Sequence, residues 1–193
     1  MPEHIWARTQ LLYVCSPGNP TGAVLTFDHW RELFALSDKH GFLIASDECY
    51  SEIYFDESNP PLGGLEAARL LNRGFERLVM LSSLSKRSNV PGMRSGFVAG
   101  DAAILKDFLL YRTYHGAALS TVFQRASVAA WQDETHVRDN RAKYLENSGR
   151  SRRCSPTCST CACPTPPSTS GRTSRAPVSR IPSSRRACTP TIM

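Results

Sequence analysis

The fold of this chain is indicated most clearly by the stretch Leu78-Val79-Met80-Leu81-Ser82-Ser83-Leu84-Ser85-Lys86, in which a short apolar run leads into serines and a lysine. The apolar run predicts a buried strand, and Gly96–Ala99, just after Arg94, predicts another. In α/β proteins, ligands bind at the carboxyl ends of the strands. The stretch therefore predicts an α/β fold with a ligand site around Lys86.

Two further strands are predicted on the amino-terminal side of this stretch. Leu11–Val14 is an apolar run that ends before a Pro-Gly turn, and Phe42–Ala45 is another, which places Asp47 at its carboxyl end. Both are predicted to be buried. Between them, Thr26 is a suitable cap for a helix over Phe27–Lys39 that ends at Gly41. One face of this helix is apolar and carries Trp30, Leu33, Phe34 and Ser37.

The segments after the fourth predicted strand have helical spacing of apolar residues, and they cover Ala102–Thr113, Ser120–Gln132 and Thr135–Glu146. Only a connection rich in Pro and Gly is expected between Glu57 and Gly64. Strands that alternate with helices favour a mostly parallel sheet flanked by helices. The functional residues then lie at the strand ends.

Composition divides the chain into residues 1–150 and residues 151–193. The second part has no Asp, Glu, Leu or aromatic residue, and 35 of its 43 residues are Ser, Thr, Pro, Arg or Cys. Such a segment cannot bury enough apolar surface to offset its ordering entropy, so we expect a disordered tail of low complexity. Its composition also suggests translation of GC-rich DNA in a shifted reading frame, a hypothesis that the gene sequence tests.

Charge and cysteine usage exclude several classes of function. Seven arginines lie in the tail, so residues 1–150 carry 16 basic and 17 acidic side chains, which argues against nucleic-acid binding. The pair Cys158 and Cys161 has zinc-knuckle spacing, but no second pair and no His follow, so no metal site is expected. Cys15 and Cys49 fit reduced thiols. We find no signal peptide and no membrane-spanning stretch, and we expect a cytoplasmic protein.

The polar residues at the predicted strand ends have complementary chemistry. Lys86 offers an amine that can bond covalently to an aldehyde, and Asp47 offers a carboxylate for a ring nitrogen. Tyr50 and Asn19 are donors for a ring oxygen. A phosphate would be bound by the remaining three residues, Ser83, Ser85 and Arg94. Together these groups match the functional parts of pyridoxal 5′-phosphate.

Each group has a chemical reason to be present. A carboxylate at position 47 would keep a pyridine nitrogen protonated, so that the ring withdraws electrons from a substrate carbanion. Once freed by an incoming amino acid, the Lys86 amine could move a proton between the substrate Cα and the aldehyde carbon. His115 is interpreted as a packing or surface histidine and Cys49 as a buried thiol.

From Trp6 to Tyr144, the chain resembles the class I/II aminotransferases, which are pyridoxal phosphate enzymes of fold type I. The resemblance implies that Lys86 bonds the cofactor, Asp47 pairs with its ring nitrogen, and Asn19 and Tyr50 contact its ring oxygen. The implied phosphate ligands are Ser83, Ser85 and Arg94. The amino-acid sequences of residues 85–96, 111–116 and 6–10 are similar to those of the bacterial succinyldiaminopimelate transaminases of lysine biosynthesis.

This resemblance implies amino-acid and keto-acid substrates and a homodimer. Enzymes of the family are considerably longer, so we expect that an amino-terminal part is missing and that the tail does not supply the arginine that binds the substrate carboxylate. Three alternatives remain: an inactive remnant, another class I/II transaminase or carbon-sulfur lyase, and an interaction module whose Arg/Ser-rich tail binds acidic partners.

Overall fold

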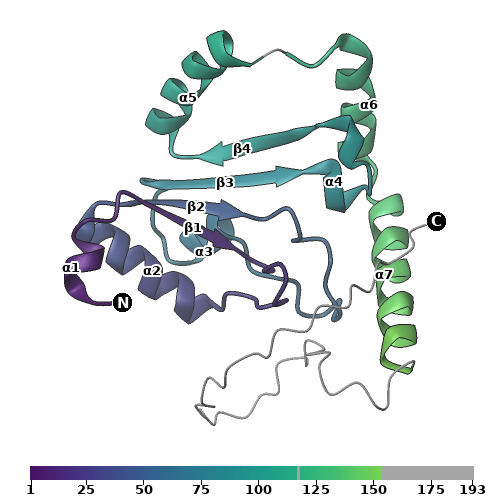
Figure 1. The fold of residues 1–193 in the computed structure, drawn as a ribbon, viewed down its shortest axis with the longest axis horizontal. Coiled ribbons are helices and arrows are strands. Elements are labelled where there is room, and N and C mark those ends of the chain that lie inside the picture. The colour runs from purple at the N-terminus through teal and green to yellow at the C-terminus, as the bar shows by residue number, and fades with distance from the viewer. Residues whose placement is uncertain (117, 154–193) are drawn as a thin grey trace, which may run out of the picture.

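Four strands form one sheet in the computed structural model, which describes residues 1–116 and 118–153. Their order across the sheet is the order in the chain: β1 (Leu11–Cys15), β2 (Leu43–Asp47), β3 (Leu78–Ser83) and β4 (Gly96–Gly100). The first three strands are parallel, and β4 is antiparallel to β3 (Figure 1). The predicted α/β class with a mostly parallel sheet is confirmed.

Helices occupy the connections between strands and the segment after β4. They are α1 (Glu3–Trp6), α2 (Phe27–His40), α3 (Gly64–Leu70), α4 (Leu84–Arg87), the 3₁₀ turn η1 (Pro91–Met93), α5 (Ala102–His115), α6 (Thr121–Gln132) and α7 (Thr135–Arg153). The four longer helices were predicted. The ends of α2, α5 and α6 differ by one or two residues, whereas α7 continues seven residues past the predicted Glu146 and so includes residues 151–153, which were predicted to belong to the disordered tail. The short elements α1, α3, α4 and η1 were not predicted, because isolated helices of this length have little periodic pattern. The predicted disordered tail lies outside the described residues from position 154 onward.

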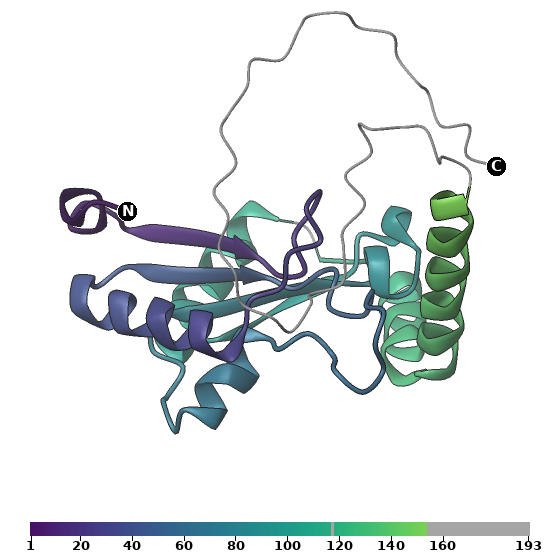
Figure 2. The same ribbon diagram turned by 90° about the horizontal axis from the view of Figure 1, so that it is seen from below.

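The core lies between one face of the sheet and the helices α2 and α3 (Figure 2). Trp30 and Phe34 of α2 are buried against Ile44 and Leu78 of the central strands, and α3 contributes two alanines. Each large apolar side chain buried in this way contributes about 1.5–3 kcal/mol. The predicted apolar face of α2 is therefore confirmed, and it fixes this helix against the strands that lead to the site.

Both predicted ends of α2 are also confirmed. The Thr26 hydroxyl accepts a hydrogen bond from the backbone N–H of His29, and the His29 ring in turn accepts from the Thr26 backbone N–H. Gly41 ends the helix with a φ of 80°, a left-handed conformation that glycine adopts without a steric cost. The next strand, β2, can thus begin two residues later.

The prediction that the first strand is buried was wrong. β1 is an edge strand, and its side chains alternate between exposed and half-buried, with Leu11 48% and Tyr13 63% exposed. Leu12 and Val14 point the other way and pack against the core. An unbroken apolar run does not distinguish a strand packed on both faces from one packed on a single face.

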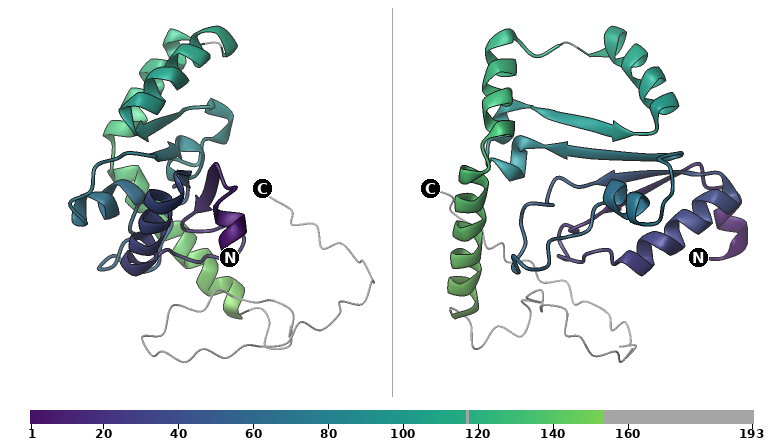
Figure 3. Two further views of the ribbon diagram at one scale, coloured as in Figure 1. Left: turned by 90° about the vertical axis from the view of Figure 1, so that its left-hand side faces the viewer. Right: turned by 180° about the vertical axis from the view of Figure 1, so that it is seen from behind.

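Helix α7 stands at the end of the sheet toward which β1, β2 and β3 run (Figures 1 and 3). It follows α6 after a short turn and passes close to the segments that leave β2 and β3. The residues predicted to be functional lie in those segments. None of the helices in the described ranges is long and apolar enough to cross a lipid bilayer.

Candidate functional site

Lys86 lies one helical turn beyond the end of β3. The strand ends at Ser83, whose hydroxyl accepts a hydrogen bond from the backbone N–H of Ser85 at 3.3 Å and caps the four-residue helix α4. A serine at this position satisfies one of the unpaired N–H groups of a helix start. The sequence predicted a loop here, and the short helix corrects that prediction. Because Lys86 is helical, its direction is set by the orientation of α4.

Asp47 is the last residue of β2, the strand beside β3. Its backbone is opposite Cys15 of β1 and Leu81 of β3, so it belongs to a central strand of the sheet. Its oxygen Oδ1 accepts a hydrogen bond from the backbone N–H of Cys49 at 3.1 Å. This local turn fixes the carboxylate at the carboxyl end of β2, beside the end of β3 that leads to Lys86.

Asn19 and Tyr50 are in contact, as expected for two donors to one ligand atom. The Asn19 side-chain amide donates to the Tyr50 phenol oxygen at 3.2 Å across 31 residues of chain. A phenol that accepts through its oxygen keeps its own hydrogen to donate, and the amide nitrogen keeps its second hydrogen. Both residues therefore retain a donor for a ligand.

The Lys86 amine lies over the Tyr50 ring, with Nζ 5.6 Å from the ring centroid. An ammonium group at this distance is attracted by the negative face of the ring. Three segments thus meet in one place: the turn after β1 with Asn19, the turn after β2 with Tyr50, and α4 with Lys86.

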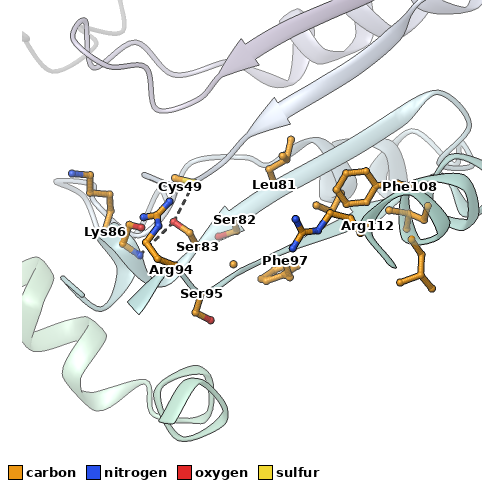
Figure 4. A pocket seen from close by; sticks show the side chains of 15 residues that line it. Cys49, Leu81, Ser82, Ser83, Lys86, Arg94, Ser95, Phe97, Phe108 and Arg112 are labelled. Atoms are coloured by element: carbon orange, nitrogen blue, oxygen red, sulfur yellow. Dashed lines mark hydrogen bonds between the residues drawn. The ribbon is translucent and has the colours of Figure 1, made fainter. Parts of the chain in front are cut away.

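A cavity of about 840 Å³ opens beside this group, on the sheet face over β3 and β4 (Figure 4). The predicted residues Ser83, Ser85, Lys86 and Arg94 line it, whereas Asn19, Asp47 and Tyr50 do not. In Figure 4, the Arg94 guanidinium lies near Ser83, and the Lys86 side chain extends away from them. Leu81, Phe97 and Phe108 form an apolar wall, and Arg112 lines the cavity near Phe97.

Arg94 has a left-handed backbone, with φ 54° and ψ 31°, directly after η1. Few residues other than glycine adopt this conformation, and such residues are common at binding sites. The guanidinium donates from Nη1 to the Pro91 carbonyl at 2.9 Å, which uses one of its five N–H groups. Its other N–H groups have no hydrogen-bond partner among residues 1–116 and 118–153 and can bind an anionic ligand.

Cys49 was interpreted as a buried thiol without a part in the site, and the structure differs. The side chain is half-buried, lines the cavity and accepts a hydrogen bond from the Ser83 hydroxyl at 3.4 Å. Its partial burial raises the pKa of the Cys49 thiol above its usual value, so the thiol is protonated at neutral pH. His115 is exposed and its ring contacts Tyr111, as the sequence predicted for a packing or surface residue.

Glu48 was missed by the sequence analysis although it is next to Asp47. Its buried carboxylate accepts hydrogen bonds from the Ser46 hydroxyl and the Gly64 backbone N–H, both at 2.8 Å. Burial raises the pKa of the Glu48 carboxyl, and these two bonds oppose the rise. The contact ties the end of β2 to the start of α3. No local pattern signals it, because Gly64 is 16 residues away.

The set of donors fits pyridoxal 5′-phosphate. An amine, a carboxylate, a phenol with an amide, and two hydroxyls with a guanidinium lie around the carboxyl edge of one sheet, as this cofactor requires. Within residues 1–116 and 118–153, no group of three or more His, Cys, Asp or Glu could hold a metal ion. The tail cysteines with zinc-knuckle spacing lie outside that range.

Comparison with known proteins agrees with this chemistry. The sequence pattern of the family described as "Aminotransferase class I and II" matches residues 3–153. A probable aminotransferase of Mycobacterium tuberculosis is 38% identical over 136 residues, which are 70% of this chain and 32% of that protein. The LL-diaminopimelate aminotransferase of Maridesulfovibrio salexigens is 30% identical over 142 residues, 73% of this chain and 36% of that protein.

Two solved structures show the same fold. An aminotransferase of Neisseria meningitidis has a TM-score of 0.75 and 64% identity over 78% of this chain and 38% of its own. A probable N-succinyldiaminopimelate aminotransferase of Thermus thermophilus has a TM-score of 0.68 and 27% identity, again over 78% of this chain and 38% of its own. The chain spans about a third of the length of the two curated relatives.

Proposed function

Because this chain belongs to the class I and II aminotransferase family, we propose that it binds pyridoxal 5′-phosphate at Lys86 and serves amino transfer between amino acids and keto acids. Members of this family use this cofactor. The proposal is carried by the meeting of Asn19, Tyr50 and Lys86, which come from three separate segments. The amide contacts the phenol, and the amine lies over the same aromatic ring.

When bound, the cofactor supplies an aldehyde that reacts with amines and a protonated ring that accepts electrons. Lys86 would hold the aldehyde end and would move a proton at the substrate Cα. Asp47, at the end of β2, would keep the ring nitrogen protonated. Tyr50 and Asn19 would donate to the ring oxygen. Arg94 binds the phosphate with the two serine hydroxyls, Ser83 and Ser85, in the lined cavity.

For the substrate, we propose amino transfer between glutamate and N-succinyl-2-amino-6-oxopimelate, a step of lysine biosynthesis whose aminated partner is N-succinyl-LL-diaminopimelate. This proposal is supported by the amino-acid sequence around Lys86 and Tyr111. It is also supported by the probable N-succinyldiaminopimelate aminotransferase among the similar structures and by the LL-diaminopimelate aminotransferase among the relatives. The homodimer implied by the resemblance and the cytoplasmic location expected from the sequence belong to the same proposal.

The cofactor proposal is tested by adding pyridoxal 5′-phosphate to the protein, reducing with borohydride and mapping the modified lysine by mass spectrometry. We expect modification at Lys86 and its loss in Lys86→Ala, with Lys39, Lys106 and Lys143 unmodified at stoichiometric cofactor. Equal labelling of all four lysines, or none, would refute specific binding and favour an inactive remnant of the family.

The substrate proposal needs a second measurement on the loaded protein. Amino transfer converts the cofactor to its amine form and changes its visible absorbance, so single-turnover mixing with each candidate donor ranks the donors. We expect N-succinyl-LL-diaminopimelate to react faster than LL-diaminopimelate or tyrosine. A faster reaction with either of the other two would replace this substrate assignment and leave the cofactor assignment intact.

A further inference from the structure

Helix α4, which carries Lys86, is too short to hold its own orientation. It has four residues, and the last carbonyls of a helix have no partner within the helix. A helix of one turn also gains too little from its own hydrogen bonds to be stable alone. Contacts from elsewhere in the fold must therefore fix α4, and with it the direction of the Lys86 amine.

Asn140 of α7 supplies that contact. Its side-chain nitrogen Nδ2 donates to the carbonyl oxygen of Lys86 at 3.1 Å and to that of Arg87 at 3.3 Å. The residues are 54 and 53 positions apart in the chain, and the bonds are partly buried. One amide thus caps the carboxyl end of the helix that bears the proposed cofactor lysine.

Neighbouring contacts make the attachment of α4 to α7 specific. One turn earlier on α7, the ring nitrogen Nε2 of His136 lies 2.8 Å from the hydroxyl of Ser88, the residue that ends α4. The Arg87 side chain is 7% exposed, donates to the Ala130 carbonyl and pairs with Glu134. Because consecutive helical residues point in different directions, holding Arg87 on this side turns Lys86 toward Tyr50.

Arg141, which follows Asn140 on α7, holds the other side of the site. Arg141 donates to the backbone carbonyl of Glu52 at 3.1 Å and pairs with the carboxylates of Glu52 and Glu57 at 3.0 Å and 2.6 Å. Glu52 is two residues after Tyr50. The adjacent residues Asn140 and Arg141 of α7 therefore hold helix α4, which carries the proposed lysine, and the turn that carries the proposed ring-oxygen donor Tyr50.

We propose that Asn140 is a positioning residue for Lys86. Asn140 caps α4 and so sets the reach of the Lys86 amine toward the cofactor aldehyde. This inference rests on the proposed role of Lys86. It requires that Asn140 affects the formation of the covalent bond more than it affects the binding of the cofactor's ring and phosphate.

The first test uses the cofactor-free protein and hydrogen–deuterium exchange. The backbone amides of Ser88 and Val90 both donate to the Leu84 carbonyl and report on α4. We expect Asn140→Ala and Asn140→Asp to speed exchange in the peptide 84–90 by about tenfold, the effect of losing one to two partly buried hydrogen bonds. Asn140→Asp keeps the volume but cannot donate. Lys143→Ala, an exposed change on the same helix, should exchange as the wild type does.

The second test separates covalent from non-covalent binding. We expect the Asn140 variants to slow borohydride-trapped modification of Lys86 about tenfold, while their affinity for 4′-deoxypyridoxine 5′-phosphate, which lacks the aldehyde, stays within about twofold of wild type. Wild-type exchange at 84–90, or an equal loss of affinity for the analogue, would overturn the proposal. If Lys86 is not modified even in the wild type, the cofactor assignment fails, and exchange still decides whether Asn140 caps α4.

Discussion

The side-chain amide of Asn19 donates a hydrogen bond to the phenol oxygen of Tyr50 at 3.2 Å, although 31 residues separate them. Asn19 follows β1 and Tyr50 follows β2, and these strands are parallel neighbours in register from Leu11 opposite Leu43 to Cys15 opposite Asp47. The carboxyl ends of the two strands therefore lie side by side. The contact means that the two proposed donors to the cofactor ring oxygen act as a pair.

For this pair, we expect Asn19→Ala and Tyr50→Phe each to raise the pH at which the visible absorbance of the bound cofactor changes. Donors to the ring oxygen stabilise its anionic form, and loss of one hydrogen bond corresponds to about one pH unit. The double variant should shift by less than the sum, because Asn19 acts partly through Tyr50. A pH titration by absorbance measures this. Tyr13→Phe, at an exposed position of β1, is the control, and an equal shift there would contradict the assignment.

Replacing Asp47 should change the protonation of the cofactor ring. We expect the ring nitrogen of ¹⁵N-labelled cofactor to be protonated at pH 8 in the wild type and unprotonated in Asp47→Ala, because no carboxylate then stabilises the charge. The ¹⁵N chemical shift reports this directly. Cofactor affinity should fall less than the rate of amino transfer does. A protonated nitrogen in Asp47→Ala would show that another group supports the ring.

Arg94→Ala should weaken binding of pyridoxal 5′-phosphate by about 10- to 100-fold, the effect of removing a charge-assisted hydrogen bond. Binding of pyridoxal, which has no phosphate, should be unchanged, and fluorescence titration with both ligands measures the difference. Arg112→Ala is the matched control, since Arg112 lines the same cavity but is not one of the proposed phosphate ligands. Equal weakening of both ligands by Arg94→Ala would mean that Arg94 does not act on the phosphate.

Glu48 should make the folded state more stable at lower pH, the opposite of the usual effect of a carboxyl group. Its folded-state pKa is raised, so the native protein binds the proton more tightly than the unfolded chain does. The contribution of Glu48 to the free energy of unfolding, taken as the difference between the wild type and Glu48→Gln, should therefore rise as the pH falls through the raised value and be complete below the ordinary pKa of 4.5. Glu48→Gln keeps both acceptor contacts and should remove this dependence. Urea unfolding across this range measures it.

The same experiment separates the charge of Glu48 from its hydrogen bonds. At pH 7, Glu48→Gln should be at least as stable as the wild type, because it removes the cost of burying a charge. Glu48→Ala should lose about 2 kcal/mol, because the Gly64 N–H is left without its acceptor. If Glu48→Gln were as unstable as Glu48→Ala, the ionised carboxylate itself would be required.

The strands, the long helices and the identity of the polar residues at the strand ends were accessible from the sequence. Apolar runs and turn residues are local signals, and each predicted strand leads to the residue that it presents: Asp47 ends β2, and Lys86 follows β3. The capping of α2 by Thr26 and Gly41 is equally local. Family resemblance then supplied roles for these residues, which the experiments above test.

Other features depend on residues that are distant in the chain. The exposure of β1 follows from its place at the sheet edge, and the place of Cys49 in the cavity wall follows from β2 lying beside β3. The contacts of Glu48 with Gly64 and of Asn140 with Lys86 join segments 16 and 54 residues apart. Sequence alone determined which chemical groups follow which strand, because that depends on neighbours in the chain. Only the tertiary structure decided which of those groups meet and what holds them, because a hydrogen bond between distant segments leaves no periodic signal.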